Sequence, residues 1–250
     1  MHPNVIGGGF SLDGDDTHLE FGHAIQKDLA ESGISMAIFF VEYTLVPHGT
    51  FPTQMQEGVE ALQFVLDSGR KPSEIILGGD SAGGNVSLAV LSHLTHPSAD
   101  ARKIEINQPL KALVVIAPWI SFNNDWPSAQ RSRYKDIVTT EAATRWSSDY
   151  LGRRESDNYS EAASAPASWW KGAKVENMIV TAGADELMAD MIAHWVEKYK
   201  VSDTTSGLTR RTPSMASRFV FRVSRFVFRH FPAAEYQSMC ADTLRVVGQS

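Results

Sequence analysis

Residues 78–85 read Gly-Gly-Asp-Ser-Ala-Gly-Gly-Asn and connect an apolar strand pattern at 74–77 to a helical pattern at 86–94. In such a strand–turn–helix setting, a serine with a glycine two positions away on each side stands at the apex of a sharp turn. The following helix points its positive end and the Ala82 N–H at negative charge that forms beside the Ser81 hydroxyl. The segment predicts a nucleophilic serine, and the alternative is a glycine-rich turn with an inert hydroxyl.

The rest of the chain alternates between strand and helix patterns. Near-continuous apolar runs are typical of strands that are covered on both faces. The alternation predicts an α/β protein of one domain, residues 1–250, in which helices flank a mostly parallel sheet. Strands are expected at 36–41, 113–117 and 178–181, and helices at 16–31 with a cap at Asp16 or Thr17, at 55–69 and at 187–199.

Three segments fit this alternation poorly. Residues 121–168 are polar, carry tryptophans and have a weak helical pattern, so we interpret them as an insertion that lies over the sheet. Ahead of the first glycines, only Val5-Ile6 has strand character. Residues 217–223 and 224–229 repeat the motif SRFVFR in tandem with a period of seven. Because an odd insertion reverses the face that each side chain presents, one copy is expected in the last strand and the other outside it.

Composition and charge disfavour some classes of function. The net charge of −6 disfavours nucleic acid as the main partner, and the single cysteine, Cys240, excludes an internal disulfide. The first residues lack a signal-peptide pattern, the most apolar run, 112–117, is too short to cross a membrane, and the last three residues are not a peroxisomal address. We therefore expect a cytoplasmic protein without membrane contact.

A nucleophilic serine needs a base and a third group that orients the base. Asp185 is the preferred acid because it follows a predicted strand, with Asp190 and Glu186 as rivals and a helix cap as the alternative role. His230 is the preferred base because it stands between a strand-like and a helical segment, and a plain surface histidine is the alternative. His194 lies within a predicted helix and is interpreted as structural.

A glycine run at 7–9, followed by Phe10, comes straight after the first strand residues. Without side chains, such a run lets main-chain N–H groups approach a substrate carbonyl to the distance of about 3 Å that an oxyanion requires. A flexible terminus is the alternative interpretation.

Five motifs in this order resemble the hormone-sensitive-lipase branch of the α/β-hydrolases, which includes bacterial and fungal carboxylesterases. They are GGGF at 7–10, EYTLVP at 42–47, GDSAGGN at 79–85, PW at 118–119 and GADEL at 183–187. The similarity runs from about residue 5 to residue 200. The sequence around Ser81 is most similar to that of fungal members. Some of those members belong to secondary-metabolite clusters, including clusters that make toxins.

The resemblance implies an α/β-hydrolase fold with Ser81 as nucleophile, Asp185 as acid and the base near His230. It also implies a partial cap within 121–168, a small-molecule ester as partner, and no metal or organic cofactor. The oxyanion donors that it implies are Gly7, Gly8 and Ala82.

The chain departs from the family at three places. Ile6 stands where the family has a histidine, the family's first strands and N-terminal cap segment have no counterpart, and residues 201–229 do not match. We expect a serine hydrolase that cleaves carboxylic esters of small or medium acyl groups through an acyl-enzyme. The alternatives are an acyl or thioester hydrolase or transferase of fungal secondary metabolism, and a catalytically impaired, hydrolase-like binding protein.

Overall fold

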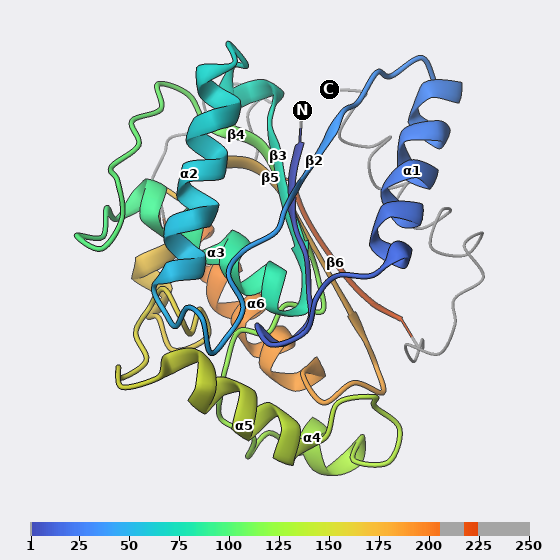
Figure 1. The fold of residues 1–250 in the computed structure, drawn as a ribbon, viewed down its shortest axis with the longest axis vertical. Helices are drawn as coiled ribbons and strands as arrows, with labels where there is room; N and C mark the ends of the chain where they lie inside the picture. The colour runs from blue at the N-terminus through green and yellow to red at the C-terminus, as the bar shows by residue number, and fades with distance from the viewer. Residues whose placement is uncertain (1, 206–217, 225–250) are drawn as a thin grey trace.

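The frame of the protein is a six-stranded parallel sheet with the order β2-β1-β3-β4-β5-β6 (Figure 1). The structure, a computed structural model, describes residues 2–205 and 218–224. Every neighbouring pair of strands is parallel, as the alternation of patterns predicts. The strands are β1 (His2–Val5), β2 (Ile38–Val41), β3 (Ile76–Asp80), β4 (Leu110–Ile116), β5 (Val175–Gly183) and β6 (Arg218–Ser224).

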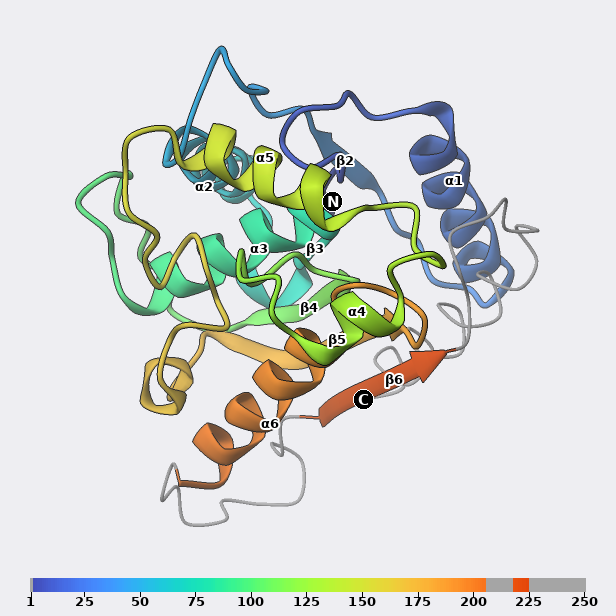
Figure 2. The same ribbon diagram turned by 90° about the horizontal axis from the view of Figure 1, so that it is seen from below.

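Helices cover the sheet on both faces (Figures 1 and 2). Helix α1 (Asp16–Glu31) lies on one face, and α2 (Thr53–Asp67), α3 (Ser81–Thr95) and α6 (Ala189–Thr205) lie on the other. Helix α3 is the central element, because every residue from 82 to 94 is buried. Burial on all sides explains why its sequence is apolar or small throughout rather than amphipathic.

The insertion contains more helix than its sequence pattern predicts. It forms α4 (Pro127–Arg131), α5 (Thr140–Leu151) and a 3₁₀ turn (Ala167–Trp170). Helices α4 and α5 lie across the end of the sheet where the strands have their carboxyl termini (Figure 1). The segment therefore holds two helices despite its weak helical sequence pattern.

Three hydrogen bonds hold the two ends of the insertion together. The Asn85 side-chain amide on α3 donates to the carbonyls of Trp119 and Ser160, each at 2.7 Å. Between the two flanks, the Ala163 N–H donates to the Ile120 carbonyl at 3.0 Å. The chain thus enters and leaves the insertion at one place beside the first turns of α3.

Several element boundaries differ from the predictions. Helix α1 is capped by Asp15, whose carboxylate accepts the Thr17 N–H at 3.1 Å, and not by Asp16 or Thr17. Helix α6 begins at Ala189, two residues after the predicted start. The first copy of the tandem repeat forms β6, which pairs in parallel with β5. The second copy beyond Ser224, together with His230 and Cys240, lies outside the described residues.

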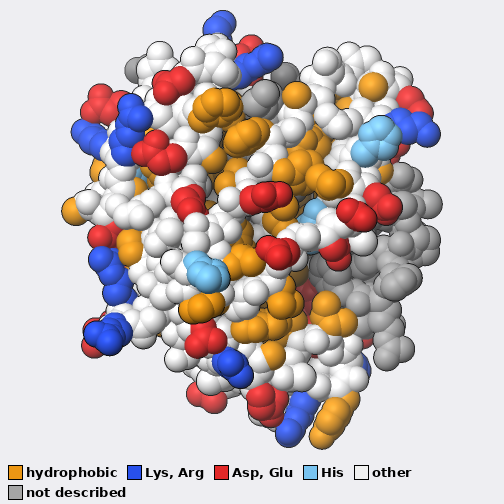
Figure 3. Space-filling model, viewed as in Figure 1, with side chains coloured by type: hydrophobic (Ala, Val, Ile, Leu, Met, Phe, Trp, Pro, Cys, Tyr) orange, Lys and Arg blue, Asp and Glu red, His pale blue; other side chains and the backbone are white. Residues whose placement is uncertain are grey.

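One face of the molecule carries side chains of several kinds. Figure 3 shows acidic and apolar side chains interspersed over the middle of one face, with most lysine and arginine side chains toward its rim. Over residues 2–205 and 218–224, no helix has both the length and the apolar character needed to cross a membrane.

Candidate active site

Ser81 occupies a strained turn at the carboxyl end of β3. The strand ends at Asp80, α3 begins at Ser81, and the Ser81 φ angle is +47°, in the left-handed region that non-glycine residues rarely adopt. The Trp119 N–H donates to the Ser81 carbonyl at 2.9 Å, which ties the turn to the segment after β4. The predicted strand–turn–helix setting is confirmed, and the strain is stored where the hydroxyl is presented.

The glycine loop before α1 is packed in place and is not a flexible end. Phe10 is fully buried, its ring stacks on Tyr150 with centroids 3.7 Å apart, and its carbonyl accepts the Val46 N–H at 2.9 Å. Gly9 has a φ of +59°, and a Cβ there would lie 2.4 Å from Cε3 of Trp146. Only glycine satisfies both the backbone angle and the close approach of the indole ring.

The N–H of Gly7, the first amide of the glycine loop, already has a hydrogen-bond partner. The Gly7 N–H donates to Oδ1 of Asp80 at 3.0 Å, so in this arrangement it is not free to receive an oxyanion. The assignment of Gly7 as an oxyanion donor stays a prediction, and it requires this amide to exchange Asp80 for the substrate oxygen. Gly8 and Ala82 remain candidates, and the structure adds Gly9, which lines a pocket together with Ser81.

Asp185 lies in the loop after β5, one strand beyond β4 and two beyond β3, so its loop reaches the same edge of the sheet as Ser81. Its Oδ1 pairs with Lys135 Nζ of the insertion at 2.7 Å. Because α6 begins only at Ala189, Asp185 is not the cap of that helix. The helix-cap interpretation is therefore wrong.

The two rival acids are differently placed. Asp190 is in the first turn of α6 and pairs with Arg131 at 2.9 Å. Glu186 is buried, and burial raises the pKa of its carboxyl to about 7, with the nearby Asp136 charge acting in the same direction. A carboxyl that is half protonated near neutral pH is poorly suited to stabilise an imidazolium, which favours Asp185 over Glu186.

The predicted base falls outside the described part of the chain. His230 is not among the described residues, so its position relative to Ser81 stays a prediction. The other candidate, His194, lies on α6 with its ring 5.3 Å from the Trp126 ring, centroid to centroid. This aromatic packing agrees with the structural role expected for His194.

A small apolar pocket opens beside Ser81. Its empty volume is about 260 Å³, including the part open to solvent, which is at the small end for ligand pockets. The walls come from the glycine loop, the Ser81 turn, the segment from Trp119 into the insertion, and the acid loop, so four separate parts of the chain meet there. The lining residues are Gly9, Ser81, Trp119, Val138, Ala143, Trp146, Leu187 and Met188.

Sequence reasoning missed Lys135 and the pocket walls Val138 and Ala143. A lysine beside a carboxylate 50 positions away leaves no local signal. A signal existed for the helix that carries Ala143, because Thr139 is a capping residue whose hydroxyl accepts the Ala142 N–H at 3.1 Å.

The fold and the site together define an α/β hydrolase with a serine at the turn after its central strand. A family model described as "alpha/beta hydrolase fold" matches residues 5–216, so the chain belongs to this family. The resemblance to hormone-sensitive-lipase-like carboxylesterases is confirmed, whereas the likeness to fungal members stays a prediction.

Relatives of known name agree with this assignment. LipR of Mycobacterium tuberculosis, named as an acetyl-hydrolase, is 26% identical over 195 residues, which are 76% of this chain and 57% of LipR. An esterase of Acinetobacter venetianus is 31% identical over 121 residues, 48% of this chain and 38% of that protein. The match thus spans little more than half the length of LipR and less than half that of the Acinetobacter esterase.

Solved structures show the same fold. An esterase from the bacterial hormone-sensitive lipase family has a TM-score of 0.76 at 21% identity and is matched over 99% of this chain and 74% of its own. A hormone-sensitive lipase from a metagenome library has a TM-score of 0.79 at 16% identity, over 99% and 77%.

Proposed function

We propose that this chain is a serine carboxylesterase that cleaves small or medium acyl esters through an acyl-enzyme. The observation that carries the proposal is the left-handed backbone of Ser81 at the mouth of an apolar pocket. Strain of this kind persists only where the surrounding structure imposes it, and it clusters at sites of chemistry. The names of the relatives, which include esterase and acetyl-hydrolase, support the same reaction class.

In the proposed mechanism, His230 takes the proton of the Ser81 hydroxyl as the oxygen attacks the ester carbonyl. The negative charge that develops on the carbonyl oxygen is received by the N–H groups of Gly8, Gly9 and Ala82 and by the positive end of α3. The protonated base then donates to the leaving alcohol, and an acyl-Ser81 ester remains. Water, activated by the same base, hydrolyses this ester, while Asp185 orients and stabilises the imidazolium.

The lining of the pocket supports the proposed preference for small or medium acyl groups. Its walls are indole rings and aliphatic side chains, so it binds hydrocarbon and offers little to a charged acyl group. Trp146 of α5 is one of the lining residues, and we expect its ring to limit the chain length that fits.

The test is hydrolysis of p-nitrophenyl acetate and butyrate by the wild type and by Ser81→Ala. We expect loss of at least about a thousandfold in kcat, because the covalent route is removed. Labelling by a fluorophosphonate should occur in the wild type and not in Ser81→Ala. Equal hydrolysis by both proteins contradicts the proposal, and tight ligand binding without labelling identifies a hydrolase-shaped binding protein.

A further inference from the structure

Asp80 precedes the nucleophile and uses its carboxylate in an unusual way. It is the N-cap residue of α3, yet its side chain makes no capping hydrogen bond to that helix. An aspartate at this position ordinarily accepts an N–H of the first turn. Here Oδ1 instead accepts the Gly7 N–H at 3.0 Å, across to the end of β1.

The approach of Asp80 to the glycine loop is close. A Cβ on Gly7 would lie 2.1 Å from Oδ2 of Asp80, so any other residue at position 7 would displace the carboxylate. The loop that begins at Gly7 continues through Gly8 and Gly9, which we assign to the oxyanion site. The Asp80 carboxylate is therefore one of the contacts that hold this loop, at its Gly7 end, while buried Phe10 holds the other end.

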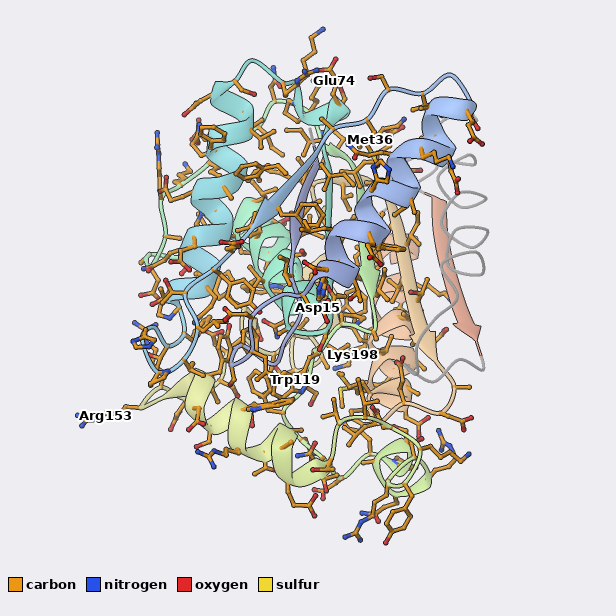
Figure 4. The ribbon with its side chains drawn as sticks, turned by 45° about the vertical axis from the view of Figure 1, so that its right-hand side comes forward. Asp15, Met36, Glu74, Trp119, Arg153 and Lys198 are labelled. Atoms are coloured by element: carbon orange, nitrogen blue, oxygen red, sulfur yellow. The ribbon has the colours of Figure 1, made fainter. Side chains whose placement is uncertain are left out.

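A histidine from α1 holds the second oxygen of that carboxylate. His18 Nε2 lies 3.5 Å from Asp80 Oδ2, and His18 Nδ1 lies 3.1 Å from Asp15 Oδ1. In Figure 4, Asp15 lies at the end of α1 that faces the carboxyl ends of the strands, on the same side as Trp119. The imidazole thus lies between two carboxylates, and its Nδ1 also faces the Asp15 backbone N–H at 3.3 Å.

We propose that His18 is a positioning residue for the Ser81 site: its imidazolium fixes the Asp80 carboxylate, which holds the Gly7 amide and thereby the oxyanion loop. The inference rests on the proposed function, since it concerns how the same site is held in its active shape. His18 does not touch the substrate, and its effect is transmitted through Asp80 and Gly7.

The charges around the ring favour its protonated form. The Asp80 carboxylate, 3.5 Å from Nε2, is the main cause that raises the pKa of His18 to about 9, and Asp15 adds to it, against the opposing effect of partial burial. Tyr43 faces the same carboxylate, and burial together with the Asp80 charge raises the pKa of its hydroxyl, so it stays neutral. When His18 loses its proton above pH 9, the positive charge between Asp15 and Asp80 disappears.

The experiment compares wild type, His18→Gln and His23→Gln. Glutamine keeps a donor for Asp80 and removes the charge, and His23 is an exposed histidine on the same helix. For His18→Gln we expect kcat on p-nitrophenyl butyrate to fall about tenfold with little change in KM, since the loop acts on the transition state. The wild type should lose kcat/KM as pH rises through about 9, and this step should be absent in His18→Gln.

A second readout does not depend on catalysis. Hydrogen exchange of the amides at residues 6–12, followed by mass spectrometry, should accelerate in His18→Gln and remain as in the wild type in His23→Gln. Unchanged exchange, or a lower melting temperature with unchanged kcat and pH profile, overturns the positioning role. If Ser81→Ala hydrolyses like the wild type, the proposed function fails, and the exchange result still decides whether His18 holds the loop.

Discussion

Lys135 Nζ lies 2.7 Å from Asp185 Oδ1, so the insertion is joined by an ion pair to the loop that carries the proposed acid. The same two segments are joined by Arg131 with Asp190 and by the Asp136 carboxylate, which accepts the Leu187 N–H at 2.5 Å. The acid loop is therefore held by the insertion as well as by the sheet.

Removing Lys135, the cation beside Asp185, should change the pH dependence of kcat/KM and have only a small effect on stability. In Lys135→Met, we expect the acidic limb of kcat/KM to move upward by a few tenths of a pH unit, because a positive charge near Asp185 opposes protonation of the base. The pair is partly exposed, so the loss of unfolding free energy should be only about 0.2–1 kcal/mol. Steady-state kinetics from pH 5 to 9 measures the shift.

Lys103→Met is the matched control, since Lys103 pairs with Glu105 on the loop before β4 at 2.8 Å. Its profile should match that of the wild type. If Lys135→Met matches it as well, the ion pair has no electrostatic effect on the base.

Trp146 should set the upper limit of acyl length. In Trp146→Ala, the pocket lengthens toward α5, and the ratio of kcat/KM for octanoate to that for butyrate should rise about tenfold or more. Trp146→Phe keeps a ring in the same place and should change the ratio much less. The measurement is a series of p-nitrophenyl esters, and an unchanged ratio in Trp146→Ala would show that another wall limits the chain.

Gly9→Ala should be damaging for two separate reasons. The added methyl group would lie 2.4 Å from the Trp146 ring, and the φ of +59° is unfavourable for alanine. We expect a fall in kcat of about a hundredfold, because the Gly9 amide is displaced from the oxyanion site. The double variant Gly9→Ala/Trp146→Ala removes the steric clash, so the part of the loss that it does not restore measures the backbone contribution.

Glu186 should make the stability depend on pH. Its pKa is raised from an ordinary value of 4.5 to about 7, so the folded protein holds a proton that the unfolded chain has released. The free energy of unfolding therefore falls as pH rises from about 4.5 to 7, by on the order of 1–3 kcal/mol. Glu186→Gln should flatten this dependence in urea titrations, whereas the exposed Glu155→Gln should retain it.

Substitution of His230 and substitution of His194 should have opposite effects on kcat and on the melting temperature. His230→Gln should lower kcat by at least about a thousandfold with little loss of stability, because a general base is removed. His194→Gln loses the ring packed on Trp126 and should lower the melting temperature while kcat is retained. Comparison of kcat with the melting temperature for each variant separates the two roles, and a normal kcat in His230→Gln would exclude it as the base.

The fold could be predicted from sequence mainly where its determinants are local. The glycines around Ser81 and the apolar runs on either side fix a strand, a turn and a helix within about 20 residues, and the structure has all three. Helix α5 was missed although its buried residues Ala143, Ser147 and Tyr150 recur at helical spacing, because two of the three are small or polar and the segment is mostly polar.

The details of the site depend on contacts that no local pattern encodes. The Gly7 amide has its partner 73 positions away in Asp80, and that contact decides which amides of the glycine run are free. A glycine-rich loop predicts that donors exist, but not how many of them another residue already occupies.

The side-chain amide of Asn85 should influence how substrate reaches Ser81. By holding Trp119 and Ser160 together, it fastens both roots of the insertion to the helix that begins at the nucleophile. Because both ends of the insertion are hydrogen-bonded to α3, we expect the insertion to move with that helix, and we expect substrate to reach Ser81 without an opening step. Saturation curves for a sparingly soluble ester should accordingly run smoothly through its solubility limit, with no burst of turnover when droplets appear.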